Sequence, residues 1–137
     1  MTQKDDTAER NVVRVEGDIV FVRRVGETQL RDVQRMCKAM EDTLAAHGRG
    51  FWLFDLKDAG GFGAEARKWA GEWEKQHAVT ALAAFGGNLE IRSLTRLIAT
   101  AVKASSSLRS EFVAEFFNTE AEARAWIDAL RARPPAP

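Results

Sequence analysis

Residues Phe51–Gly63, which read FWLFDLKDAGGFG, are the most informative about the fold of this chain. Its first four residues are apolar and run without a break into Asp55. An unbroken apolar run predicts a strand that is buried on both faces, as in a parallel sheet covered by helices. The glycines that follow predict a short turn, after which an amphipathic helix is expected to open at Gly63. The turn would lie at the carboxyl end of a central strand, where α/β folds place their working groups.

The rest of the chain alternates predicted strands and helices. Asn11–Glu16 and Asp18–Val25 are rich in β-branched residues, and Gly17 between them predicts a tight hairpin. Periodic or continuous apolar segments predict helices over residues 28–47, 64–77 and 89–104, and strands over residues 79–85 and 111–117. The order β-β-α-β-α-β-α-β-α predicts one small α/β domain. Its five-stranded sheet should be mostly parallel, with an antiparallel hairpin at the N-terminal edge and four helices.

The last predicted helix has a clear N-terminal signal. Thr119 and Glu122 fit a capping box, in which each side chain satisfies a backbone amide of the other residue. The residues expected to point inward from this helix are Ala123, Trp126, Ile127 and Leu130. Residues 1–10 and the proline-containing residues 132–137 are expected to be disordered tails that flank a domain over residues 11–131.

The composition excludes several classes of protein. Apolar residues make up 45% of the chain and charged residues 29%, which is typical of a soluble globular protein. Twenty basic residues balance twenty acidic ones, whereas nucleic-acid binding usually requires a basic excess. No apolar run is long enough for a transmembrane helix, and the N-terminus lacks the apolar segment of a signal peptide. With Cys37 as the single cysteine, we expect a cytoplasmic protein.

Few side chains indicate catalysis or metal binding. Cys37, His47 and His77 are the only thiol and histidines, and they lack the spacing of metal ligands or of a catalytic pair. Asp55 and Asp58 are either site carboxylates or acceptors of hydrogen bonds from the turn. The glycines before the next helix either expose amides to an anion or allow tight packing, and they match no nucleotide-binding motif. We therefore expect no catalytic residue, no metal and no cofactor.

The predicted helix over residues 89–104 has two unusual faces. Its basic residues Arg92, Arg96 and Lys103 fall within an arc of about 40°. Its apolar residues cover about 140° on another side, which is wider than packing on one sheet face requires. The excess predicts a subunit interface, the wall of a small apolar pocket, or packing on a neighbouring helix. On the preceding helix, Trp69 and Trp73 form a one-turn stripe that belongs either to the core or to a ligand pocket.

Three features of the sequence resemble a known family. They are the order of elements, the FWLFDL strand that ends in Asp-Leu, and the closing FFNTEAEARAWI of residues 116–127. Together they resemble the STAS domain, and more narrowly its SpoIIAA-like or SEC14-like bacterial group, over roughly Val12–Leu130. The resemblance implies a small α/β regulatory or interaction module without metal. Related anti-sigma-factor antagonists are phosphorylated at the start of the second helix, but residues 55–79 contain no serine, threonine or tyrosine.

The sequence leaves two functions open. The first is a non-enzymatic STAS-like regulatory module that binds an unidentified protein, or a second copy of itself as a homodimer. Its expected contact surface comprises Asp58, Gly60, Gly61, Phe62, Gly63, Arg92, Arg96 and Lys103. The second is a carrier or sensor of a small apolar or anionic ligand, for which a lipid is the natural candidate by analogy with SEC14-like proteins. Its expected pocket is lined by Trp69, Trp73, Leu94 and Ile98.

Overall fold

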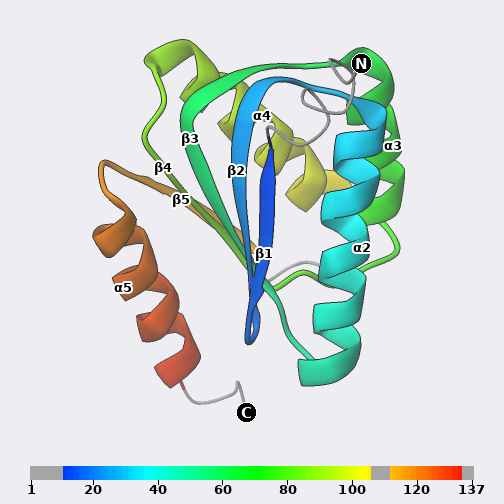
Figure 1. Cartoon of the computed structure of the whole chain (residues 1–137). Helices are drawn as coiled ribbons and strands as arrows, with labels where there is room; N and C mark the ends of the chain where they lie inside the picture. The colour runs from blue at the N-terminus through cyan, green and yellow to red at the C-terminus, as the bar shows by residue number, and fades with distance from the viewer. Residues whose placement is uncertain (1–10, 106–111, 134–137) are drawn as a thin grey trace, which may run out of the picture.

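Each of the five strands in the sheet lies beside the strand that precedes it in the chain, in the order β1-β2-β3-β4-β5 (Figure 1). The computed structural model describes residues 11–105 and 112–133, with β1 antiparallel to β2 and the other strand pairs parallel. The strands are β1 (Val12–Glu16), β2 (Ile19–Thr28), β3 (Phe51–Phe62), β4 (Ala81–Phe85) and β5 (Val113–Phe117). The helices are α2 (Leu30–His47), α3 (Ala64–Glu74), α4 (Leu89–Ser105) and α5 (Glu120–Ala132). This architecture confirms the predicted fold class, including the antiparallel edge hairpin.

The strand order places three helices on one face of the sheet. Every parallel crossover advances by one strand in the same direction, so right-handed connections put α2, α3 and α4 on the same side. The remaining helix, α5, follows the last strand and covers the opposite face (Figure 1). Two separate cores result: a larger one beneath α2, α3 and α4, and a smaller one beneath α5.

The strand β3 contributes to both cores, as its unbroken apolar run predicts. Trp52 and Phe54 face α2 and α4, whereas Phe51 and Leu53 face α5. All four side chains are at most 7% exposed. Alternation along one strand therefore fixes the two sides of the sheet.

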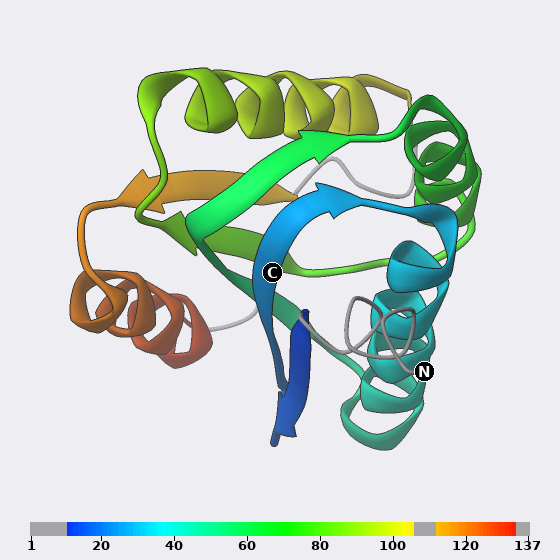
Figure 2. The same ribbon diagram turned by 45° about the horizontal axis from the view of Figure 1, so that its top comes forward.

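Three helices do not fit side by side over the parallel part of the sheet. Strands are about 4.8 Å apart, so the four parallel strands span about 14 Å. Packed helix axes are about 8–10 Å apart, so three helices in a row need about 16–20 Å. The helix α3 is displaced and packs chiefly against α2, touching the sheet through Trp73, whose ring lies 6.4 Å from that of Trp52. Figure 2 shows α2 and α3 next to each other, with α4 farther from α2 on the same side of the sheet.

The glycine-rich stretch after Asp55 is part of β3 and not the predicted turn. It stays extended and pairs with β2, with Val25 opposite Asp58 and Thr28 opposite Phe62. A Cβ atom added at Gly60 would lie 2.9 Å from the backbone of β2, so this glycine permits a close approach of the two strands. The prediction of a turn is wrong because glycine serves here for close approach and not for chain reversal. The helix α3 still begins where expected, with Gly63 as its N-cap.

The C-terminal helix is built as its sequence predicts. The Thr119 hydroxyl accepts a hydrogen bond from the Glu122 amide, and the Glu122 carboxylate accepts one from the Thr119 amide, both at 3.2 Å. Ala123 and Ile127 are fully buried beneath the sheet, and Trp126 and Leu130 pack against the same core. The helix continues to Ala132, while the predicted tail residues 1–10 and 134–137 lie outside the described residues.

A buried carboxylate joins the hairpin to the rest of the domain. The side chain of Asp18, at the start of β2, is 8% exposed and pairs with Arg49 and with Arg131 of α5. The Arg131 Nε atom lies 3.1 Å from both carboxylate oxygens, and the Arg49 Nε atom lies 2.8 Å from one. Burial raises the pKa of Asp18, but the two guanidinium groups outweigh burial and hold the pKa below its ordinary value.

Asp18→Asn is expected to lower the free energy of unfolding by about 1–3 kcal/mol at neutral pH, because two guanidinium groups lose their anion. In the folded protein, the pKa of Asp18 lies below its ordinary value of 3.8. The stabilisation is therefore present above that value and is lost as the pH falls through the folded pKa. Urea unfolding at neutral and acidic pH measures both effects.

The matched control is Asp128→Asn, which removes a 69% exposed carboxylate that pairs with the same Arg131. We expect this control to change the free energy of unfolding by less than about 0.5 kcal/mol. A neutral-pH stability of Asp18→Asn equal to that of the unsubstituted protein would contradict the assigned role of Asp18.

Candidate functional site

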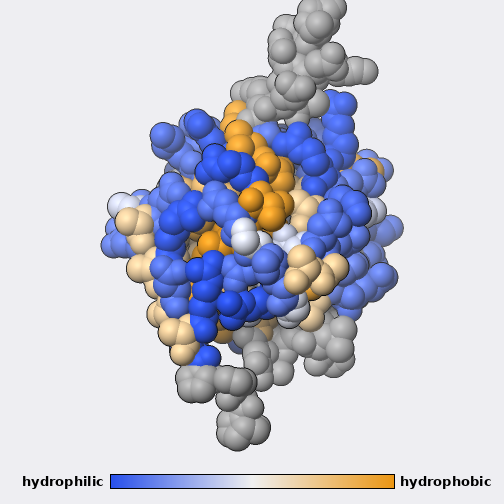
Figure 3. Space-filling model, turned by 60° about the horizontal axis from the view of Figure 1, so that its bottom comes forward, coloured by the Kyte–Doolittle hydropathy of each residue, from blue (hydrophilic) through white to orange (hydrophobic). Residues whose placement is uncertain are grey.

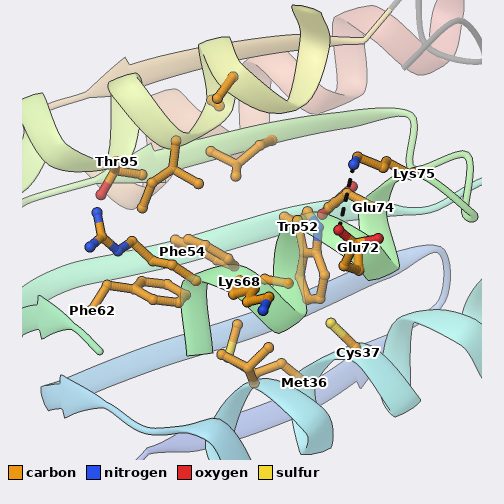
Figure 4. A pocket seen from close by; sticks show the side chains of 18 of the residues that line it. Met36, Cys37, Trp52, Phe54, Phe62, Lys68, Glu72, Glu74, Lys75 and Thr95 are labelled. Atoms are coloured by element: carbon orange, nitrogen blue, oxygen red, sulfur yellow. Dashed lines mark ion pairs between the residues drawn. The ribbon is translucent and has the colours of Figure 1, made fainter. Parts of the chain in front are cut away.

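A cavity of about 390 Å³ lies between α2, α3 and α4, above the sheet. Its floor is formed by side chains of β2, β3 and β4, and α3 borders it on the outside. In Figure 4, Met36 and Cys37 point into the space from α2, while Thr95 comes from α4 on the other side of Trp52 and Phe54. Most of the lining side chains are apolar, and the volume falls in the range of about 300–1,000 Å³ that is typical of small-molecule sites.

The cavity follows from the displacement of α3. The floor residues Trp52, Phe54 and Leu82 belong to the larger core, and a helix packed directly over the central strands would cover them. Because α3 packs on α2 instead, the wall opposite α2 is supplied by Ile98 and Ala99 of α4. The space is thus a property of the layer arrangement and does not depend on one small side chain.

Charged residues of α3 border the cavity. Lys68, Glu72 and Lys75 are exposed and line its outer side. Lys75 Nζ lies 3.5 Å from Glu72 Oε2, as the dashed line in Figure 4 shows. Figure 3 shows a mainly hydrophilic face of the molecule with a band of hydrophobic residues between the hydrophilic ones. A polar rim around an apolar interior is the usual arrangement of a ligand-binding cleft.

One cation lines the cavity from within. Arg24 is 2% exposed and occupies the next inward position on β2 after Val20 and Val22. Its Nε atom donates a hydrogen bond to Thr28 Oγ1 at 2.8 Å, and its guanidinium carbon lies 5.0 Å from the centre of the Phe62 ring. Burial lowers the pKa of Arg24 to about 10, so the group remains charged at neutral pH.

The thiol in the lining is not activated. Cys37 is 3% exposed, and burial raises the pKa of its thiol well above the ordinary value, with Glu74 and Glu41 adding to the rise. A thiol that stays protonated is a poor nucleophile and a poor metal ligand. In the described part of the chain, no three His, Cys, Asp or Glu side chains are grouped so that they could hold a metal ion.

The residues of the predicted interaction surface lie in two places. The residues between Asp58 and Phe62 form the end of β3, and Gly63 is the N-cap of α3. Gly60 and Gly61 accept hydrogen bonds from Arg24, and Phe62 lines the cavity. This segment therefore forms part of the cavity wall, and a role in partner binding stays a prediction.

The basic residues of that predicted surface belong to α4. Arg92 donates a hydrogen bond to the carbonyl oxygen of Phe117 at the end of β5. The Arg96 guanidinium carbon lies 4.4 Å from the centre of the Phe116 ring. Lys103 is exposed near the end of α4 and lines a shallow hollow beside β5 together with Arg96. Arg92 and Arg96 thus tie α4 to the edge strand.

The four residues of the predicted pocket do not share one cavity. Ile98 lines the cavity described above, and Leu94 is half-buried one turn earlier on α4. Trp69 and Trp73 line a separate hollow. Trp73 is 5% exposed, and its Nε1 atom donates a hydrogen bond to Glu41 Oε2 at 2.7 Å. Because Glu41 belongs to α2, this hydrogen bond connects α3 to α2. The Trp73 ring also stacks on His77, which follows α3, with the centroids 4.2 Å apart.

Sequence reasoning missed Arg24 as a member of the site. The signal was available in the strand alternation, because Val20 and Val22 face the core and the same period places Arg24 on that face. A charged residue at an inward position is unusual and marks a site to inspect. Met36 and Phe54 were also missed as lining residues, since both fit an ordinary core.

Fold and site together define a small α/β domain whose distinctive feature is a mainly apolar cavity, bordered by α3, with one buried cation in its lining. A family model described as SpoIIAA-like matches residues 19–128, so the chain belongs to the SpoIIAA-like family. This finding confirms the resemblance to STAS-like proteins. None of the helices in the described residues is both long and apolar enough to cross a bilayer.

A solved structure has the same fold. The crystal structure of an uncharacterised protein with a SpoIIAA-like fold from Shewanella loihica PV-4 is similar over 85% of this chain and 90% of its own. The TM-score is 0.58 and the sequences are 19% identical, so the likeness shows the fold alone. No curated protein matches this chain.

Trp73→Ala is expected to lower the free energy of unfolding by about 3–5 kcal/mol, because it leaves a cavity between α2 and α3. Trp73→Phe keeps most of the buried ring and loses the hydrogen bond to Glu41, so it should cost about 1 kcal/mol. Urea unfolding followed by far-UV circular dichroism measures both values. A loss below about 1 kcal/mol for Trp73→Ala would contradict a core role and would favour a role in binding.

Proposed function

We propose that this protein is a non-enzymatic, STAS-like binding module that holds a small apolar ligand in the cavity between α2 and α4, as a carrier or a sensor. The observation that supports this proposal is the mainly apolar cavity of about 390 Å³ between the helices and the sheet. Protein interiors are normally filled to the density of organic crystals. Side chains that line an empty space lose van der Waals contacts, and an apolar ligand would restore them.

The chemistry of the lining favours binding over turnover. The Cys37 thiol remains protonated, and a guanidinium group cannot act as a general base at neutral pH. The hydroxyl of Thr95 is engaged with the carbonyl oxygen of Ile91 at 2.9 Å. The lining is therefore suited to hold a molecule and offers it no activated nucleophile.

A second candidate function is a protein-interaction module, and the outer face of α4 favours it. Leu89 and Leu97 of this helix are 80% and 65% exposed, which is unusual for large apolar side chains. The same helix lines the cavity through Ile98. A ligand in the cavity would therefore contact the same helix that exposes Leu97. This contact would couple ligand binding to partner binding in one regulatory module.

The start of α3 lacks the hydroxyl group through which related antagonists are regulated. Phosphorylation at this position in antagonists of the family requires a hydroxyl group, and here the helix begins at Gly63 and Ala64. A phosphate-controlled switch at this place has no acceptor, so we propose that a ligand in the cavity provides the regulatory signal.

Native mass spectrometry and solvent extraction of freshly purified protein test the leading proposal. We expect a co-purifying apolar molecule at close to one equivalent, and its removal should leave a protein that binds decanol. A bare chain that does not bind decanol, together with the mass of a dimer, would overturn the proposal in favour of the interaction module.

Two neighbouring tryptophan substitutions on α4 locate the binding site. Ile98→Trp fills the cavity and is expected to weaken decanol binding at least tenfold, about 1.4 kcal/mol, in isothermal titration calorimetry. Leu97→Trp adds the same side chain at an exposed position and should leave the affinity unchanged. Equal effects of the two substitutions would show that decanol binds elsewhere.

A further inference from the structure

We propose that the ligand of this cavity is an amphiphile with a carboxylate head group, and that Arg24 receives that head group. This inference rests on the proposed function, since it names the chemical class of the ligand. The apolar lining would hold the alkyl part of the molecule. The features that carry the proposal are the burial of Arg24, its hydrogen-bonding partners and its place in the lining.

The charge of Arg24 lacks an anion. Its hydrogen-bond acceptors are the Thr28 hydroxyl and the carbonyl oxygens of Gly60 and Gly61, all of them neutral. Within residues 11–105 and 112–133, no carboxylate forms an ion pair with this guanidinium group. A buried charge is costly unless an opposite charge accompanies it. An anionic ligand in the cavity would supply the missing charge.

Donors of Arg24 remain available for that anion. A guanidinium group carries five N–H donors in a planar fork. The Nε atom donates to Thr28, and Nη2 donates to Gly60 and Gly61 at 3.1 and 3.2 Å. Among the described residues, Nη1 donates to no acceptor, and Arg24 lines the cavity. A carboxylate placed against Nη1 would gain charge-assisted hydrogen bonds in a water-poor environment.

The backbone holds the guanidinium group in place for this role. The register between β2 and β3 shifts at Arg24 itself, between its neighbours Arg23 and Val25. It shifts again between Gly26 and Thr28. The carbonyl oxygens of Gly60 and Gly61 are directed at Nη2. A flexible arginine side chain fixed by three acceptors is pre-organised, which reduces the entropy that binding would otherwise cost.

Apart from the charged residues of α3 on its outer side, the rest of the cavity suits an alkyl chain. Met36, Trp52 and Phe54 provide an apolar surface, and methionine adapts its shape to irregular ligands. The volume of about 390 Å³ lies near the lower end of the range of about 300–1,000 Å³ for small-molecule sites. A single chain of medium length fits this volume better than a lipid with two chains.

A set of ligands that share one alkyl chain and differ in head group tests the inference. Decanoate, decanol, decyl phosphate and decyltrimethylammonium are titrated into the full chain by isothermal titration calorimetry at neutral pH, where decanoate is ionised. We expect decanoate to bind at least about tenfold more tightly than decanol. Arg24→Met should remove that difference while decanol still binds, and Arg24→Lys should retain part of it because the charge remains without the fork.

Arg23→Met is the matched control, because Arg23 is the neighbouring arginine on β2 and its side chain is 44% exposed and paired with Asp58 at 2.8 Å. It should leave the preference for decanoate unchanged. If Arg24→Met fails to fold, the comparison of decanoate with decanol on the unsubstituted protein decides the matter, together with Arg24→Lys.

The outcomes separate this inference from the proposed function. Equal affinities for decanoate and decanol would overturn the inference and leave the apolar binding site in place. Tighter binding of decyl phosphate than of decanoate would replace the carboxylate by a phosphate head group. Loss of the preference in Arg23→Met would also overturn the role of Arg24. No binding of any of the four ligands would overturn both the inference and the proposed function.

Discussion

The mismatch between the width of a helix and the spacing of strands shapes this structure. Because the strand order follows the chain order, right-handed crossovers place α2, α3 and α4 on one face of the sheet, and its four parallel strands are too narrow for three helices in a row. The helix α3 accordingly packs on α2, with Trp73 as the main connection between the two helices and β3. The central strands are left partly uncovered, and their apolar side chains become the floor of a cavity.

The polar end of the cavity results from a second structural feature, the extension of β3 through its glycine-rich segment. Gly60 lets this segment approach β2 closely, and the carbonyl oxygens of Gly60 and Gly61 then contact Arg24. A conventional turn in this place would leave Arg24 without two of its acceptors. The extended strand therefore makes it possible for a charged side chain to occupy an inward position of an apolar sheet.

The sequence predicts the fold well and the site poorly, and the reasons are physical. Apolar runs, helical periodicity and capping residues are local features, so the order of elements along the chain and the capping box at Thr119 follow from them. The cavity depends on where α3 packs relative to α2 and α4, which periodicity does not specify. Ile98 was expected near a pocket and lines one, whereas Trp73 serves a helix contact. The inward position of Arg24 is visible in the strand alternation, but its lack of a counter-ion is a three-dimensional property.

X-ray diffraction from xenon-pressurised crystals of the ligand-free protein is the sharpest test of the cavity, because xenon enters dry apolar cavities. We expect xenon in contact with Met36, Phe54 and Ile98, with α2 and α4 separated as in Figure 2. Crystals without xenon at this position, in which α4 packs directly on Trp52 and Phe54, would contradict this expectation.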